Sequence, residues 1–253
     1  MNRAADWILD DRAPGAQCEL LCLPHAGGSS LSYREWQGWA PDWMTVRAVE
    51  LPGRGRRFGE PPLRRMHLVA GRVAAAIAAQ VDRPFALFGH SMGALIAFET
   101  ARVLADRGGP LPCRLFLSAM AAPVRNAGRG EALHAASDGV LIERLRSYDG
   151  TPPEVLANPD LLGLVLPIIR ADFEMLETYR IGAGEPLDVP VTVLGGREDA
   201  LVGPADLLRW REYAPLAGVR TFDGGHFYLT EHGPGVVDHI AAELAGSLVG
   251  TPA

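Results

Sequence analysis

Short apolar runs alternate along this chain with longer segments in which apolar residues recur at helical spacing. Phe85–Phe88 has the length of a buried strand, whereas His67–Val81 repeats apolar residues every four positions, as a helix with one buried face does. The predicted strands are Glu19–Leu23, Thr45–Leu51, Phe85–Phe88, Arg114–Ser118, Val191–Leu194 and Gly218–Phe222, and the predicted helices are Leu31–Trp39, His67–Val81, the segment after Ser91, Ala205–Tyr213 and Val236–Leu248. This alternation predicts an α/β fold with a mostly parallel sheet covered on both faces.

The segment between Ser118 and Val191 is too long for a simple crossover between strands. Ser137 is a candidate N-cap for a helix at Val140–Arg146, and Asn158-Pro159 places a cap and a first-turn proline before a long apolar helix that Pro167 is expected to kink. We therefore predict one domain over residues 1–253 with a helical insertion at residues 123–187. The insertion is interpreted as a lid, and the alternative is that it only thickens the core.

Composition narrows the class of protein. With 48% hydrophobic residues the chain is able to form a sizeable core, and a net charge of −6 gives no reason to expect nucleic acid or an anionic membrane as partner. All 24 basic residues are arginine, which excludes Schiff-base lysine chemistry. The three cysteines form no zinc-binding pattern and indicate a reduced interior, and the first residues do not resemble a signal peptide. We expect a cytoplasmic protein.

The residues Gly89-His90-Ser91-Met92-Gly93 lie between a predicted strand and a predicted helix. The pattern G-x-S-x-G in that context is a nucleophile elbow, in which a strained turn presents a serine hydroxyl at the top of a sheet. The glycines stand where side chains would collide as the strand turns into the helix. An ordinary glycine-rich turn is the alternative, but the context predicts that Ser91 is a nucleophile.

A serine nucleophile needs an acid and a base further along the chain. Asp199 follows the predicted strand Val191–Leu194; Glu198 is the competitor, and we prefer Asp199 because a shorter acid is better held by loop backbone. Of seven histidines, His226 follows Asp223-Gly224-Gly225 after the last strand, in a turn able to bring its imidazole to the elbow. The other six (His25, His67, His90, His134, His232 and His239) are interpreted as structural or exposed.

Several motifs together resemble one known family, the type II thioesterases. They are Leu23-Pro24-His25-Ala26-Gly27-Gly28, Leu51-Pro52-Gly53-Arg54-Gly55-Arg56-Arg57, the serine motif, Leu166-Pro167-Ile168-Ile169-Arg170-Ala171-Asp172 and Gly225-His226-Phe227. The serine motif is common to all α/β-hydrolases, whereas the first turn and the Arg-Ala-Asp pattern are more particular. The resemblance covers residues 18–244 and implies an α/β-hydrolase fold. Members of the family are stand-alone editing enzymes of polyketide and nonribosomal peptide synthesis, related to the medium-chain thioesterase of animal fatty acid synthesis.

The resemblance implies a reaction and a partner. Ser91 would attack a thioester with His226 as base and Asp199 orienting the imidazole, while the backbone N–H groups of Met92 and Ala26 would hold the oxyanion. The substrate would be an acyl thioester on the phosphopantetheine arm of an acyl or peptidyl carrier protein, with no cofactor or metal, and we expect a monomer. Exposed arginines would be candidates for docking an acidic carrier: Arg54, Arg56, Arg57, Arg64, Arg65, Arg125, Arg129, Arg144 and Arg146.

Two other functions remain open from the sequence. A small-molecule carboxylesterase or an acyltransferase would use the same three side chains. A non-catalytic binding protein of the same fold would not need Asp199 or His226. Acyl-pantetheine thioesters compared with the matching oxygen esters would separate the first alternative from a thioesterase.

Overall fold

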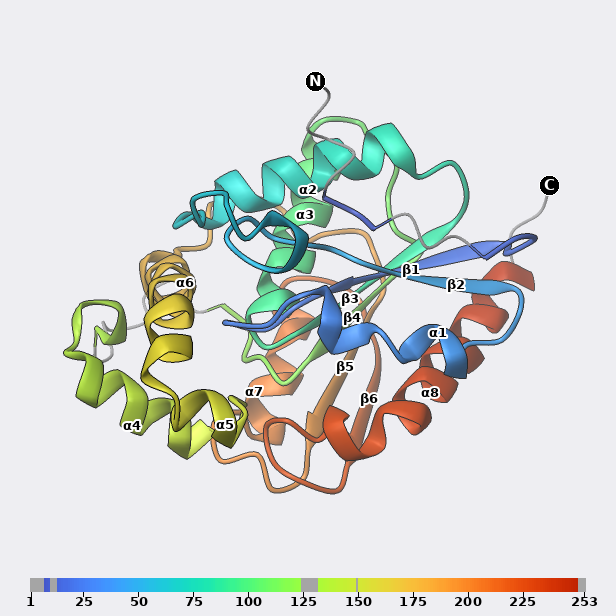
Figure 1. The fold of residues 1–253 in the computed structure, drawn as a ribbon. Helices are drawn as coiled ribbons and strands as arrows, with labels where there is room; N and C mark the ends of the chain where they lie inside the picture. Colours follow the sequence, from blue (N-terminus) through green and yellow to red (C-terminus); the bar gives the residue numbers. More distant parts are fainter. Residues whose placement is uncertain (1–6, 10–12, 124–131, 149, 250–253) are drawn as a thin grey trace.

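A single six-stranded sheet forms the centre of the computed structural model, which describes residues 7–9, 13–123, 132–148 and 150–249. The strands lie in the order β2-β1-β3-β4-β5-β6, and all five pairings are parallel (Figure 1). Their bounds are β1 Cys18–Leu23, β2 Met44–Ala48, β3 Phe85–His90, β4 Arg114–Ser118, β5 Val191–Gly196 and β6 Leu216–Phe222. The strand order reverses between β1 and β3, and in open α/β sheets the carboxyl ends of the strands at such a point are where ligands bind. The predicted α/β-hydrolase-type sheet is confirmed.

Helices cover both faces of the sheet because the central strands are buried on both sides. On β3, Leu87 packs into the cluster beneath α2 (Met66–Gln80), α3 (Met92–Asp106) and α7 (Pro204–Leu208). The next residue, Phe88, packs into the opposite cluster beneath α1 (Trp36–Trp39) and α8 (Leu229–Val249). Figure 1 shows these two layers on either side of the strands.

Helices are the regular elements in the described part of the segment between β4 and β5, and they lie at one end of the sheet (Figure 1). It contains η4 (Leu133–Ala135), α4 (Asp138–Tyr148), α5 (Pro153–Leu156) and α6 (Pro159–Thr178). Asn158 caps α6 as predicted, since its Oδ1 accepts hydrogen bonds from the N–H groups of Asp160 and Leu161. The segment has a small apolar cluster of its own, formed by Leu133, Leu141, Leu145, Leu166 and Ile169. Residues 124–131 of the predicted insertion lie outside the described part, and its role as a lid stays a prediction.

Some predicted bounds are wrong for identifiable reasons. The predicted helix at Leu31–Trp39 is instead a 3₁₀ turn, η2 (Ser30–Tyr33), followed by the short α1. Tyr33 at the end of η2 and Trp36 at the start of α1 both pack their rings against Phe88, which fixes the two short elements against the same strand. β2 ends at Ala48, before the predicted end at Leu51, and the next residue, Val49, forms an antiparallel bridge with Ile8.

Three further helices differ from the prediction. α8 begins at Leu229, before Pro234, and is kinked at His232 (φ −109°, ψ 15°). α6, by contrast, continues through Pro167 as one helix. The predicted helix Ala205–Tyr213 divides into α7 and a 3₁₀ turn, η5 (Arg209–Glu212). None of the described helices has the length and hydropathy that a membrane-spanning segment needs.

Candidate active site

Ser91 occupies a strained turn between β3 and α3. Its φ of 52° is positive, which is rare for a residue other than glycine. The flanking glycines permit this turn, because a Cβ on Gly89 would lie 2.1 Å from the carbonyl oxygen of Gly93 and one on Gly93 would lie 2.1 Å from that of Leu23. α3 therefore begins in contact with the end of β1, and the backbone geometry is that of the predicted nucleophile elbow.

The three side chains predicted from the sequence to act together do converge. His226 Nε2 lies 3.1 Å from Ser91 Oγ, and His226 Nδ1 lies 2.9 Å from Asp199 Oδ2. The side chain of Asp199 is fully buried and that of His226 is 10% exposed. Because an ionised carboxylate only accepts hydrogen bonds, Nδ1 carries the proton and Nε2 is left to accept from the serine hydroxyl.

Asp199 is held by the loop after β5. Its Oδ1 accepts hydrogen bonds from the N–H groups of Leu201 at 2.8 Å and Val202 at 3.1 Å. Burial opposes ionisation of this carboxyl, but the hydrogen bond and charge of His226, with these two N–H groups, outweigh burial and lower the pKa of Asp199. The competitor Glu198 is exposed and accepts from the N–H of Gly224 instead. The carboxylate beside the imidazole is thus Asp199.

The loops that carry Asp199 and His226 approach each other closely because both contain glycine. A Cβ on Gly196, at the end of β5, would lie 2.2 Å from the carbonyl oxygen of Gly225. No larger residue fits at position 196 without moving the loop that carries His226. Gly224, at φ +98°, supplies the turn between β6 and that imidazole.

His90 is buried behind the site, as predicted for a structural histidine. Its Nδ1 lies 2.8 Å from Ser118 Oγ, which lies 2.7 Å from the hydroxyl of Tyr228. Burial, with the neighbouring His226 and His25, lowers the pKa of His90 well below its usual value. Burial and the same His226 lower the pKa of His25 to about 4. Both rings are therefore neutral near pH 7. Sequence reasoning did not foresee this cluster, since nothing local links residues 25, 90, 118 and 228.

Two backbone N–H groups beside Ser91 have no acceptor among the residues that the structure describes. Within the described residues, no hydrogen bond is recorded from the N–H of Ala26 or of Met92, the two predicted oxyanion donors. The N–H of Gly28 donates to the carbonyl of His25 at 3.0 Å and closes a turn at residues 25–28 (the 25–28 turn). The N–H of Met92 also lies at the N-terminus of α3, where the helix dipole favours negative charge.

Two cavities meet at this point of the fold. One, of about 230 Å³, lies over Ser91 and His226 and is mostly apolar, with Ala119, Met120, Leu145, Phe173, Leu176 and Val202 in its lining. A second, of about 440 Å³, includes Tyr33, Arg34, His90 and Thr230 in its lining. His25, Gly150, Thr151 and Phe227 line both.

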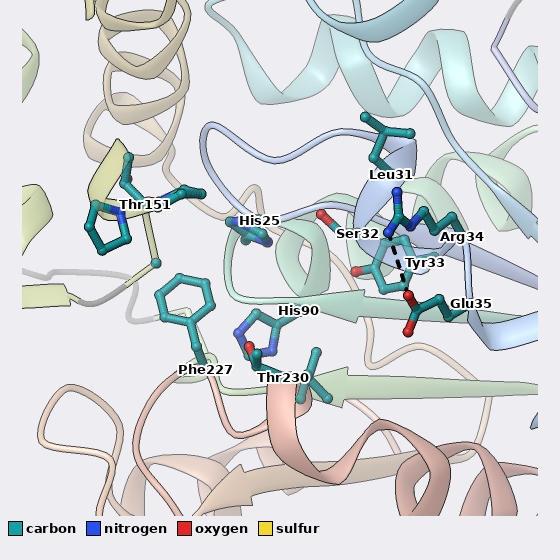
Figure 2. Close-up of a pocket in the computed structure, with 14 residues that line it drawn as sticks. His25, Leu31, Ser32, Tyr33, Arg34, Glu35, His90, Thr151, Phe227 and Thr230 are labelled. Atoms are coloured by element: carbon teal, nitrogen blue, oxygen red, sulfur yellow. Dashed lines mark ion pairs between the residues drawn. The ribbon is translucent and has the colours of Figure 1, made fainter. Parts of the chain in front are cut away.

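Figure 2 shows His25, His90 and Phe227 between Thr151 of the helical insertion and the Ser32–Glu35 segment. The rings of His25 and Phe227 pack edge to face with centroids 5.0 Å apart. The phenyl ring also covers Gly150, where a Cβ would lie 2.1 Å from it. These two rings thus form the partition between the cavities.

Several arginines suggested for partner docking are engaged within the protein. Arg54 is 4% exposed and pairs with Asp172, and Arg57 is 6% exposed and pairs with Glu60. The expectation that these two meet a carrier at the surface is therefore wrong. Arg64 and Arg65 are more exposed and bind Glu174 of α6. Arg125 and Arg129 lie outside the described residues.

The described part of the chain contains no group of three or more histidine, cysteine or acidic side chains placed to bind a metal ion. Cys18, Cys22 and Cys113 are free thiols.

Known proteins share this sequence and fold. The model of a thioesterase domain matches residues 18–244. The chain is 35% identical over 246 residues to the gramicidin S biosynthesis protein GrsT of Aneurinibacillus migulanus, covering 96% of each protein. It is 35% identical over 236 residues to the thioesterase PikA5 of Streptomyces venezuelae, covering 92% of this chain and 83% of that protein.

A solved structure matches over nearly the same length. The type II thioesterase BorB from the borrelidin biosynthetic cluster superposes with a TM-score of 0.84 at 40% identity, over 94% of this chain and 97% of that one. These similarities confirm the resemblance suggested by the motifs. The chain belongs to the thioesterase family and is a hydrolase that acts on thioesters.

Proposed function

We propose that this enzyme removes acyl groups from the phosphopantetheine arm of acyl or peptidyl carrier proteins, through an acyl-Ser91 intermediate. The observation that carries the proposal is the hydrogen-bonded series Ser91–His226–Asp199 beneath an apolar cavity. Stalled or wrong acyl groups would be cleared in this way, which is an editing role. Its relatives in gramicidin S and borrelidin biosynthesis support this setting.

Acylation begins when the hydroxyl of Ser91 attacks the thioester carbonyl. His226 Nε2 takes the hydroxyl proton, and the resulting imidazolium is stabilised by the buried carboxylate of Asp199. The carbonyl oxygen becomes an oxyanion, for which the N–H groups of Ala26 and Met92 are the proposed donors. When the C–S bond breaks, His226 returns its proton to the departing sulfur. A thiol with a pKa of about 8.5 is an easier leaving group than an amine, so its departure depends less on protonation by His226.

Deacylation repeats these steps with water as the nucleophile. His226 removes a proton from the water as it attacks the ester carbonyl, and the same N–H groups hold the second oxyanion. Collapse of this intermediate releases the carboxylic acid, and the proton on His226 returns to Ser91. The reaction as proposed needs no cofactor and no metal.

The two cavities match the two halves of a carrier-bound thioester. The cavity of about 230 Å³ over Ser91 is apolar and has room for a short acyl chain. The larger groove lies beside the His226 loop and includes the polar side chains of Ser32 and Thr230. A pantetheine arm carries amides and a hydroxyl, and its sulfur must lie within reach of His226. We therefore assign the acyl chain to the first cavity and the arm to the second, with His25 and Phe227 at the boundary (Figure 2).

The experiment that tests the proposal compares leaving groups on one acyl chain. A short acyl group is presented on a carrier protein, on N-acetylcysteamine and on the matching oxygen ester, and release is followed by intact mass or by the free thiol. We expect the highest kcat/KM on the carrier and the lowest on the oxygen ester. Equal or faster hydrolysis of the oxygen ester would favour a carboxylesterase, and transfer of the acyl group to an added alcohol or amine in place of water would favour an acyltransferase.

A further inference from the structure

A buried ion pair joins the helical insertion to the 25–28 turn. Asp172, on α6, is 1% exposed, and Arg54, in the loop after β2, is 4% exposed. The pair is bidentate: Arg54 Nη1 lies 2.7 Å from Asp172 Oδ2, and Nη2 lies 2.8 Å from Oδ1. A charged pair buried to this degree adds little net stability compared with apolar side chains of similar size, because both groups lose their hydration. Its geometry suggests a role other than stability.

Both members of the pair also bind backbone of the 25–28 turn. Asp172 Oδ2 accepts a hydrogen bond from the N–H of Gly27 at 2.8 Å, and Arg54 Nη1 donates to the carbonyl of Gly28 at 3.2 Å. Gly27 has a φ of +75°, and a Cβ there would lie 3.0 Å from Ile169, which is also on α6. The turn is thus held by one side chain from α6 and one from the loop after β2, and it packs against a second residue of α6.

These contacts determine where the N–H of Ala26 points. The peptide between His25 and Ala26 is planar and trans, so its carbonyl and its N–H point in opposite directions. The carbonyl of His25 accepts a hydrogen bond from the N–H of Gly28. Asp172 binds the N–H of Gly27 and Arg54 binds the carbonyl of Gly28, so the ion pair holds the peptide groups before and after that N–H. Since the N–H of Gly27 is bound to Asp172, Ala26 is left as the donor from this turn.

We propose that Asp172 and Arg54 are positioning residues that hold the 25–28 turn so that the N–H of Ala26 is aligned with the oxyanion. This inference rests on the proposed function, in which Ala26 and Met92 are the oxyanion donors. Neither Asp172 nor Arg54 touches the reacting atoms. They act through the backbone of the 25–28 turn. The position of the Ala26 N–H therefore depends on how α6 packs against that turn.

The test uses Asp172→Asn in the full chain, with an acyl N-acetylcysteamine thioester as substrate so that carrier docking plays no part. Loss of one oxyanion donor costs on the order of 10²–10³ in kcat in other hydrolases. For a misaligned donor we expect kcat to fall roughly 10- to 100-fold, with KM changed less than threefold. A trifluoromethyl ketone, which forms an oxyanion with Ser91, should lose affinity by a similar factor, whereas the affinity for the neutral acyl amide should stay the same. A role in stability alone would not produce this difference between the two ligands.

Glu174→Gln is the matched control. Glu174 lies two residues further along α6 and joins it to the body through Arg64 and Arg65, without contact to the 25–28 turn. We expect its kcat to stay within twofold of the wild type. If Glu174→Gln lowers kcat as much as Asp172→Asn does, general attachment of α6 explains the effect and the inference is overturned.

A second variant covers the case in which Asp172→Asn does not fold. Arg54→Met with Asp172→Leu removes both charges, so no unpaired charge remains buried and the fold is retained more readily. This double variant should also lose kcat and trifluoromethyl ketone affinity together. Wild-type kcat in either folded variant overturns the inference but leaves the proposed function intact. Failure of the wild-type enzyme to hydrolyse the thioester, by contrast, overturns the proposed function itself.

Discussion

The contact between the nucleophile elbow and β1 makes Gly93→Ala the most informative single change to the scaffold. A Cβ at position 93 would lie 2.1 Å from the carbonyl oxygen of Leu23, 2.7 Å from its carbon and 2.9 Å from the carbonyl oxygen of Pro24. All three are backbone atoms at the carboxyl end of a central strand, so no side chain is able to rotate away. Either α3 or the end of β1 has to move by about an ångström to reach an ordinary contact distance.

The expected magnitude follows from the kind of atoms involved. Overpacking in a well-packed core costs about 1–3 kcal/mol, and a clash with fixed backbone belongs at the upper end of that range. We therefore expect Gly93→Ala to lower the free energy of unfolding by about 3 kcal/mol. The same displacement moves Ser91 relative to His226 and Ala26, so the remaining folded enzyme should lose at least about tenfold in kcat, since small misplacements are costly in catalysis.

Urea unfolding followed by circular dichroism measures the stability, and labelling of Ser91 with a fluorophosphonate measures the reactivity of the folded fraction. Gly71→Ala is the control, because Gly71 lies inside α2 and a Cβ there would meet only Arg107 Nη2, at 3.5 Å. That substitution should raise stability by up to about 1 kcal/mol through helix propensity. Wild-type stability and labelling in Gly93→Ala would refute the claim that the elbow requires glycine for lack of space.

Three further predictions concern the site. Asp199→Asn should lower kcat by roughly 10³–10⁴-fold with little change in fold, because an amide does not hold His226 in the tautomer with the proton on Nδ1. Steady-state kinetics measure this loss, and a loss of less than about tenfold would contradict the prediction. The folded state lowers the pKa of His25 to about 4, against about 6.5 in the unfolded chain. Its contribution to stability is therefore complete above about pH 6.5 and is lost as the pH falls towards 4, a loss of up to about 3 kcal/mol. The lowered pKa of His90 acts in the same direction. Urea unfolding between pH 7 and 4.5 should therefore show falling stability, His25→Asn should flatten the slope, and the same slope in both proteins would contradict the assignment. Leu176→Trp should fill part of the apolar cavity and lower kcat/KM more for octanoyl than for acetyl thioesters; an equal loss on both would contradict the placement of the acyl chain.

Local patterns predicted the sheet and the three side chains that converge at the candidate site. Each strand is an apolar run between turn residues, and the glycines around Ser91 mark the one place where a strand must turn directly into a helix. Asp199 and His226 were predicted because parallel strands place their carboxyl ends at the same edge of the sheet. The position of a residue just after a strand was thus enough to predict that side chains far apart in the sequence lie close together.

Interactions that depend on tertiary packing were not predictable in this way. Arg54 reads as a surface cation in the sequence, and only the folded chain shows it buried against Asp172, 118 residues away. The series His90–Ser118–Tyr228 likewise joins β3, β4 and the loop before α8 through side chains with no local signal. The antiparallel bridge from Val49 to Ile8 likewise involves a residue outside the repeating strand–helix pattern.

Direct detection of the acyl-enzyme tests the central claim. Asp199→Asn should slow both steps, and because the ester of the acyl-enzyme is less reactive than the thioester that forms it, the intermediate should accumulate. This variant is mixed with an acyl carrier protein bearing a short acyl thioester, quenched in acid, digested and analysed by mass spectrometry. The account predicts the acyl mass on the peptide that contains Ser91, and no such mass when Ser91 is also replaced by alanine. Release of free acid at the wild-type rate by Ser91→Ala, with no acylated peptide from the serine enzyme, would contradict it.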